Sequence, residues 1–185
     1  EVGSDVATFQ AGLKAALRED PDIVLVGEMR DPESIATTLT VAETGHLVFA
    51  TLHTNDASTA LDRIVDVFPA SRQSQIRVQL AASLTAVVAQ RLVPRVGGGM
   101  IAAFEILLAS SGARALIREG KTHQVRNVIS QSVRDGMQTL EQSLSVLVAH
   151  GLITYEDACD RAVVPTDIRA PQAAPTAAPT PAPVG

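Results

Sequence analysis

Two short apolar runs, residues 22–27 and 46–52, constrain the fold of this chain most strongly. Both are too short for a helix and rich in large aliphatic residues, so we expect each to be a strand buried on both faces. Helical spacing separates them, and helix-like and strand-like segments continue to alternate up to residue 108. This alternation favours an α/β fold with a mostly parallel sheet and flanking helices.

The ends of the predicted elements are marked by capping and breaking residues. Asp31 is the expected N-cap of the helix that follows the first strand, Pro32 occupies its first turn, and Gly45 ends it. The other predicted elements are helices at 8–19, 54–67 and 71–85, strands at 86–93 and 100–108, and short helices at 113–119, 122–133, 139–150 and 154–162. We therefore predict an α/β domain over residues 1–109, an all-helical subdomain over 110–164 and a disordered Pro/Ala-rich tail over 165–185.

The composition excludes several classes of function. Aromatic residues make up 3% of the chain and the net charge is -5, with no basic cluster, which argues against nucleic-acid binding. The single cysteine, Cys159, excludes an internal disulfide and a multi-cysteine zinc site. No apolar run reaches the roughly 20 residues of a membrane span, so we expect no direct membrane insertion.

Polar residues follow both apolar runs at the point where each strand is predicted to end. Glu28 comes directly after the first run and His53 after the second. Open α/β sheets bind ligands at the carboxyl ends of their strands, and neighbouring strands would bring these two side chains together. The strand pattern alone is also explained by a strand that ends at the surface in a charged residue and by a histidine that caps or packs.

The segment 17–31 resembles the signature of the type II secretion and type IV pilus motor ATPases, in which it contains the Walker B segment. The matching residues are Leu17, Arg18, Pro21, Asp22, Gly27, Glu28, Met29, Arg30 and Asp31. Residues 44–57 are similar to the His box of the same family. The resemblance implies part of a RecA-like P-loop ATPase core that uses ATP and Mg²⁺. It also implies a cytoplasmic homohexamer, peripheral at the inner membrane, that acts on a pilus platform protein.

The same resemblance implies roles for individual residues. Glu28 would hold Mg²⁺ through water or help to activate the attacking water, and His53 would sense the phosphate. Arg30, His46 and Thr51 would lie at the nucleotide site or at a subunit boundary. A surface ion pair is the alternative for Arg30.

A phosphate-binding loop is not found in these residues. Gly120-Lys121-Thr122 looks like the end of such a loop, but position 115 is Ala where the pattern needs Gly, and a helix rather than a strand precedes it. In the family the Walker A loop lies upstream of the Walker B segment. We therefore expect the chain to be a fragment that does not hydrolyse ATP alone.

Later segments are similar to the PilT-type pilus retraction ATPases. These are residues 103–107, 136–144 and 151–158, and no four-cysteine insertion precedes Gln90-Arg91-Leu92. The helix associated with retraction is matched at Arg114, Leu116, Ile117, Arg118 and Glu119, whereas Gly112, Ala113 and Ala115 differ. The resemblance thus implies a retraction motor. The alternatives are a type II secretion or pilus-extension ATPase, and a non-hydrolysing ring subunit or scaffold.

Overall fold

The computed structural model describes residues 3–170, which fall into two compact units. The first unit joins Glu1–Arg91 to Phe104–Thr139, and the second joins Leu92–Ala103 to the residues from Leu140 onward. This division differs from the predicted boundary after residue 109. The first two helices of the predicted helical subdomain belong to the first unit, because they pack on its helices rather than on one another alone.

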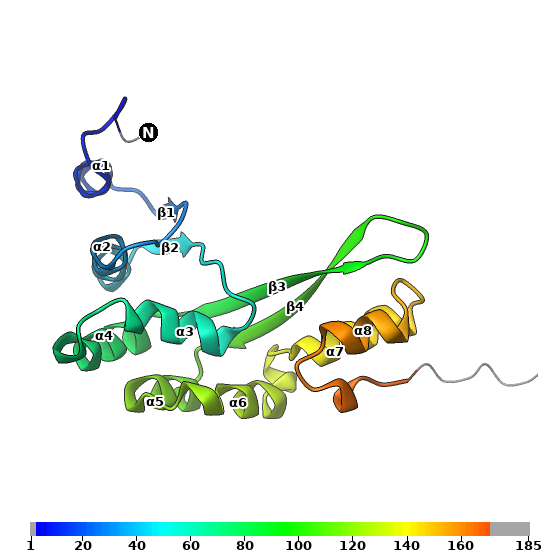
Figure 1. The fold of residues 1–185 in the computed structure, drawn as a ribbon. Helices are drawn as coiled ribbons and strands as arrows, with labels where there is room; N and C mark the ends of the chain where they lie inside the picture. The colour runs from blue at the N-terminus through cyan, green and yellow to red at the C-terminus, as the bar shows by residue number, and fades with distance from the viewer. Residues whose placement is uncertain (1–2, 171–185) are drawn as a thin grey trace, which may run out of the picture. The chain divides into compact units, whose positions relative to one another are not determined.

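The order of elements follows the predicted alternation closely (Figure 1). The first half contains α1 (Phe9–Ala16), η1 (Leu17–Glu19), β1 (Ile23–Val26), α2 (Pro32–Glu43), β2 (Leu47–Ala50), α3 (Ala57–Asp66) and α4 (Ala70–Ser83). The second half contains β3 (Ala86–Pro94), β4 (Met100–Leu108), α5 (Ser111–Glu119), η2 (Thr122–Gln124), α6 (Val125–Gln131), η3 (Val133–Asp135), α7 (Leu140–Ala149), α8 (Tyr155–Arg161) and η4 (Pro165–Asp167).

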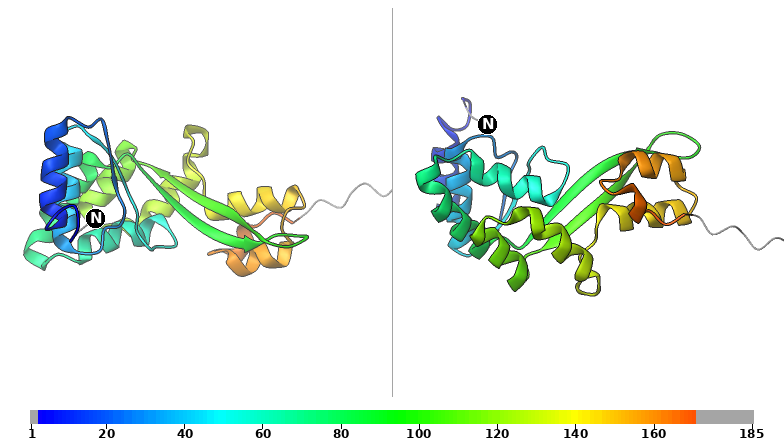
Figure 2. Two further views of the ribbon diagram at one scale, coloured as in Figure 1. Left: turned by 90° about the horizontal axis from the view of Figure 1, so that it is seen from above. Right: turned by 60° about the horizontal axis from the view of Figure 1, so that its bottom comes forward.

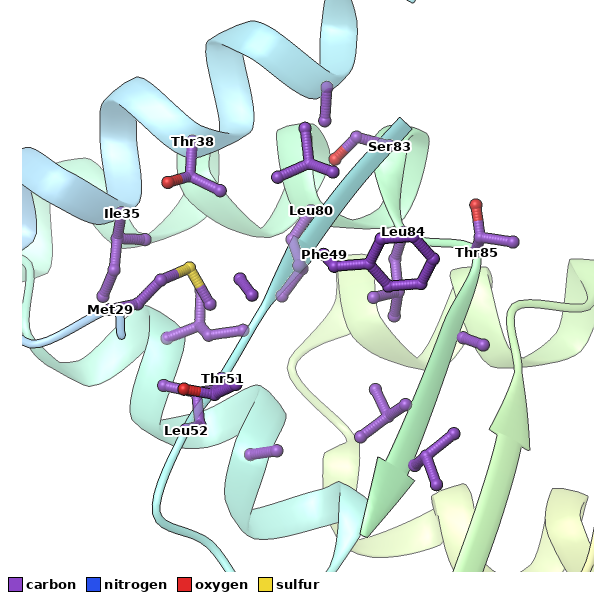
Figure 3. A pocket seen from close by; sticks show the side chains of 18 of the residues that line it. Met29, Ile35, Thr38, Phe49, Thr51, Leu52, Leu80, Ser83, Leu84 and Thr85 are labelled. Carbon is purple, nitrogen blue, oxygen red and sulfur yellow. The ribbon is translucent and has the colours of Figure 1, made fainter. Parts of the chain in front are cut away.

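The strands form two small sheets where a single, mostly parallel sheet was predicted. β1 and β2 pair in parallel, with Ile23 opposite Leu47 and Val26 opposite Ala50, and β3 pairs with β4 in a separate sheet. A cavity of about 920 Å³ borders both sheets: β2 lines it along its whole length, and so does the start of β3. Figure 3 shows the lining side chains on β2, on α2 and α4, and on Leu84 and Thr85.

The prediction that the first two strands are buried on both faces is wrong. Val26 is 2% exposed, but its neighbour Leu25 is 73% exposed. The register places the exposed side chains of both strands on one face of the sheet: Ile23, Leu25, Leu47 and Phe49. Only the opposite face packs against the core formed by α2 and its neighbours, and no other element among residues 3–170 of the first unit covers this apolar face.

The helices of the first unit begin and end within about three residues of the predicted positions. The Asp31 carboxylate accepts hydrogen bonds from the backbone N–H groups of Glu33 and Ser34, at 3.0 and 2.9 Å, and so caps α2. Asp56 caps α3 in the same way through Thr59 N–H. Helices α5 and α6 then pack against α4 and α3, as Figure 1 shows, and complete the apolar core of the unit.

The second unit consists of the outer end of the β3–β4 hairpin, α7, α8 and η4 (Figure 2). Its core includes Val93 from the hairpin and Leu144 from α7, both fully buried. The predicted disordered tail was placed too early, because residues 165–167 form η4 and Ile168 is buried in this core. Residues 171–185, the rest of that predicted tail, lie outside the described residues. No helix among the described residues has the length and apolar character needed to cross a membrane.

Candidate functional site

The predicted site residues Glu28 and His53 lie together where β1 and β2 end. His53 Nε2 is 3.0 Å from Glu28 Oε1, and the Arg30 guanidinium is 2.5 Å from Glu28 Oε2. The Glu28 side chain is 21% exposed, whereas the side chains of Arg30 and His53 are 76% and 74% exposed. A carboxylate therefore stands at the strand ends with one cationic and one titratable partner, both of them open to solvent.

Backbone contacts between the two strand ends fix this arrangement. Val26, the last residue of β1, and Met29 are buried, so the intervening Gly27-Glu28 turn has little freedom. The Thr51 hydroxyl donates a hydrogen bond to the Gly27 carbonyl, and Met29 N–H donates to the Thr51 carbonyl at 3.2 Å. These two bonds join the segment that carries Glu28 to the one that carries His53.

Several signature residues have structural roles. The Asp22 carbonyl accepts a hydrogen bond from Leu47 N–H at 3.2 Å, which starts the pairing of β1 with β2. Met29 packs into the core, and Asp31 caps α2. The Ser34 hydroxyl, 2.7 Å from Asp31, lowers the pKa of that carboxyl below its ordinary value, and Ser34 N–H adds to the effect. Leu17 and Arg18 form part of η1, which ends before Pro21.

Comparisons with known proteins show the family to which the chain belongs. The profile of the family described as type II/IV secretion system protein matches residues 3–99, more than half of the chain. The chain belongs to the type II/IV secretion system protein family. The matched range contains both the Glu28 segment and the His53 segment.

Relatives within this family are similar over most of the chain. A type IV pilus retraction ATPase, PilT, of Pseudomonas aeruginosa is 50% identical over 165 residues, which is 89% of this chain and 48% of that protein. A twitching motility protein of Neisseria gonorrhoeae is 52% identical over 163 residues, covering 88% of this chain and 44% of that protein. The chain thus spans about half the length of the curated relatives that it matches.

Solved structures give the same result for the fold. A crystal structure of the pilus retraction motor PilT with bound ADP superposes with a TM-score of 0.80 at 47% identity, over 91% of this chain and 47% of that one. The ATPase DotB of Legionella pneumophila superposes with a TM-score of 0.74 at 28% identity, over 85% of this chain and 43% of that one. The predicted α/β class and the resemblance to pilus motor ATPases are confirmed.

Not every predicted site residue lies near Glu28 in the structure. His46 precedes β2 and so lies at the opposite end of that strand from His53, where its Nδ1 is 3.0 Å from the Thr44 hydroxyl. A nucleotide-site role for His46 therefore has no support from this geometry, and its place at a subunit boundary stays a prediction. Thr51 lies at the correct end, but its hydroxyl is bonded to Gly27.

The predicted retraction helix is α5, and its residues have partners within the first unit. The Arg114 guanidinium donates hydrogen bonds to the carbonyls of Ala81 and Ala82, the latter at 2.9 Å. It thereby satisfies carbonyl groups at the end of α4. Leu116 and Ile117 pack into the core, Arg118 is exposed, and Glu119 pairs with Lys121 at 2.8 Å.

The Gly120-Lys121-Thr122 segment has a structural explanation. Gly120 ends α5 with a left-handed conformation, φ 70°. The Thr122 hydroxyl donates to Asp62 at 2.6 Å and so ties η2 to α3. The residues that imitate a phosphate-binding loop are therefore a helix end and a helix-to-helix contact.

The fit of a divalent cation rests on Glu28. No group of three or more His, Cys, Asp or Glu side chains among residues 3–170 is arranged to hold a metal ion directly. Mg²⁺ in nucleotide sites usually keeps several waters and takes one or two carboxylates besides the phosphates. A single, partly exposed carboxylate such as Glu28 suits this mode of binding.

Sequence reasoning missed three side chains near the site. Arg63 Nη1 donates to the His53 carbonyl at 3.1 Å, and Arg91 Nε donates to the Asn55 carbonyl at 3.3 Å. Glu105, 4% exposed, accepts a hydrogen bond from Ala57 N–H at 2.8 Å. Glu105 had a usable signal, because a carboxylate inside an otherwise apolar strand must have polar partners when it is buried.

Proposed function

We propose that this chain is part of a motor ATPase that couples ATP hydrolysis to type IV pilus retraction. Relatives named as a retraction ATPase and as a twitching motility protein match both compact units of the chain. The single observation that carries the chemistry is the 3.0 Å contact of His53 Nε2 with Glu28 Oε1 at the ends of two parallel strands. This is the edge at which open α/β sheets bind ligands.

Glu28 is the residue that acts on water. Its Oε2 accepts a hydrogen bond from Arg30, its Oε1 lies 3.0 Å from His53 Nε2, and the four lone-pair positions of the carboxylate leave room for water beside both. From there it orients the water that attacks the terminal phosphate, and it would hold a hydrated divalent cation through the water of that cation. Mg²⁺, when bound, supplies positive charge that offsets the charge of the phosphates.

The two partners of Glu28 are suited to respond to the phosphate. The Arg30 guanidinium is permanently charged and can bind either the carboxylate or a phosphate oxygen. The His53 imidazole has two ring nitrogens, so it can keep its contact with Glu28 through Nε2 or turn to donate a hydrogen bond to a phosphate oxygen. Because both side chains are mostly exposed, either can turn from Glu28 toward a bound nucleotide without disturbing the core.

The comparisons favour retraction over the two alternatives. A type II secretion system protein, HxcR of Pseudomonas aeruginosa, is 32% identical, and the pilus assembly ATPase PilB of Acinetobacter baylyi matches 48% of this chain. A non-hydrolysing scaffold would not need a carboxylate, an arginine and a histidine gathered at one strand end. We also propose, from the resemblance to the pilus motor ATPases, a homohexamer at the cytoplasmic side of the inner membrane that acts on the pilus platform protein.

A glutamine substitution at Glu28 tests the proposal. The whole gene product that carries this chain is used, because phosphoryl transfer needs a phosphate-positioning loop, which these residues do not supply. Glu28→Gln should lower the rate of ATP hydrolysis by about 100-fold or more, while the affinity for ATP stays within a few-fold.

The matched control is Glu33→Gln, an exposed glutamate in the first turn of α2 that should leave hydrolysis unchanged. Normal hydrolysis in Glu28→Gln would remove Glu28 from its catalytic role. The wild type could also hydrolyse ATP normally while Glu28→Gln leaves pilus retraction in cells unchanged. That result would mean that the ATPase serves a task other than retraction.

A further inference from the structure

The segment that follows β2 is held by three side chains from outside it. Arg63 of α3 bonds to the carbonyl of His53, Arg91 of β3 bonds to that of Asn55, and Glu105 of β4 accepts from Ala57 N–H. All of these residues belong to the first unit. The three bonds fall on alternate residues of the segment, so its backbone is fixed along its whole course from His53 to the start of α3.

Glu105 makes the bond that is most costly to lose. Ala57 is the first residue of α3, and its N–H has no partner within the helix. Ala57 is fully buried, so water cannot take the place of Glu105. The positive end of the helix dipole and the backbone N–H group in turn stabilise a carboxylate at this position.

The position of the His53 ring depends on this backbone. Because the ring is 74% exposed, packing does not hold it in place. What directs it toward Glu28 is the path of residues 51–57, which Thr51 fixes at one end and Glu105 at the other. A shift of the backbone by about 1 Å would lengthen a 3.0 Å contact beyond hydrogen-bond distance.

We infer that Glu105, together with Arg91 and Arg63, is a positioning residue for His53. Glu105 anchors the start of α3, and the two arginines hold the carbonyls of residues 53 and 55, so that the imidazole meets Glu28. None of the three contacts the reacting atoms. The consequence for catalysis rests on the function proposed above, whereas the consequence for the geometry does not.

The geometric part is tested on this 185-residue chain by NMR of the histidine rings. Glu105→Ala and Arg63→Ala should both shift the ring signals of His53, while those of His123 and His150 stay unchanged. Arg63 is exposed, so its variant folds and decides the matter if Glu105→Ala does not. Arg72→Ala, which removes another exposed arginine with a contact to the Phe68 ring, should leave the His53 signals in place.

The catalytic part is tested by hydrolysis in the whole gene product. Glu105→Ala and Arg63→Ala should lower kcat about tenfold and leave the KM for ATP within about twofold. Glu105→Gln should recover most of the loss, because an amide oxygen still accepts from Ala57 N–H.

Each outcome is decisive. Unchanged His53 signals in both alanine variants would overturn the inference, and so would a change confined to KM. If the wild type hydrolyses no ATP, the proposed function fails, but the shift of the His53 signals still supports the positioning role.

Discussion

Two glutamates in this chain occupy opposite environments, one in each compact unit. Glu141 of α7 is 1% exposed and accepts hydrogen bonds from the backbone N–H groups of Val163 and Val164, at 2.9 and 3.0 Å. Glu28 is partly exposed and meets two side chains, Arg30 and His53, that are themselves open to solvent. Both residues lie in segments that resemble the motor ATPases, but the resemblance implies a role at the nucleotide for Glu28 and none for Glu141.

The difference shows how the same carboxylate serves stability in one place and chemistry in another. A buried carboxylate bonded to backbone N–H groups cannot move without leaving those groups unpaired, so Glu141 holds the chain after α8 in place. A carboxylate bonded to exposed side chains can exchange them for water, a cation or a phosphate. Substitution of Glu141 should therefore change the free energy of unfolding, whereas substitution of Glu28 should change the rate of hydrolysis.

The largest expected effect is the loss of stability in Glu141→Ala. The backbone N–H groups of Val163 and Val164 lose their buried charged acceptor, which should lower the free energy of unfolding of the second unit by about 2–3 kcal/mol. Urea unfolding followed by circular dichroism measures the change. Glu156→Ala, an exposed position on α8, is the control and should cost less than about 0.5 kcal/mol. A Glu141 variant as stable as the control would mean that residues 163–164 are not anchored by this carboxylate.

The second prediction concerns the partner of Glu28. His53→Ala should lower the rate of ATP hydrolysis by the whole gene product about tenfold, which corresponds to about 1.4 kcal/mol in activation free energy. The midpoint of urea unfolding should change little, because the ring is 74% exposed and its contact with Glu28 is a surface contact. His123→Ala is the matched control. A fall in stability without a fall in hydrolysis would make His53 a structural residue like Glu141.

A smaller effect is expected where the two strand ends are joined. Thr51→Val keeps the shape of the side chain but removes the hydroxyl that donates to the Gly27 carbonyl, so it should cost about 1 kcal/mol of unfolding free energy. Thr37→Val, which removes a hydroxyl bonded to the Glu33 carbonyl within α2, is the control. If hydrolysis by Thr51→Val falls about tenfold or more while hydrolysis by the control does not, Thr51 also acts at the nucleotide, as its predicted role requires.

The local elements and the Glu28–His53 pair were predictable because their signals are local. Asp31 and Pro32 mark a helix start, and a strand followed by a polar residue places that residue at the sheet edge. The exposure of Leu25 and of its face of the sheet was not predictable, because an aliphatic run has the same sequence pattern whether one face of the strand is covered or both. The role of Glu105 depends on a contact 48 positions away in sequence, with Ala57, and no spacing rule contains that contact.

The smallest expected effect is the pH dependence of the stability that Asp31, three residues after Glu28, contributes. The Ser34 hydroxyl bond, followed by the Ser34 backbone bond, lowers the pKa of Asp31 below its ordinary value of 3.8 in the folded chain. Because the folded pKa is depressed, the stability that this carboxylate contributes is complete above pH 3.8 and is lost as the pH falls through the folded pKa.

Asp31→Asn keeps a good N-cap and removes the titration. The difference in unfolding free energy between wild type and Asp31→Asn should therefore be constant from pH 7 to about pH 5 and shift against the wild type below pH 3.8, as urea titrations at each pH will measure. A difference that does not change with pH would mean that folding leaves the pKa of Asp31 at its ordinary value, as for a solvent-exposed acid that caps no helix. The Asp31 carboxylate would then be held no more firmly than that of Glu28, and the contrast between the two residues would be lost.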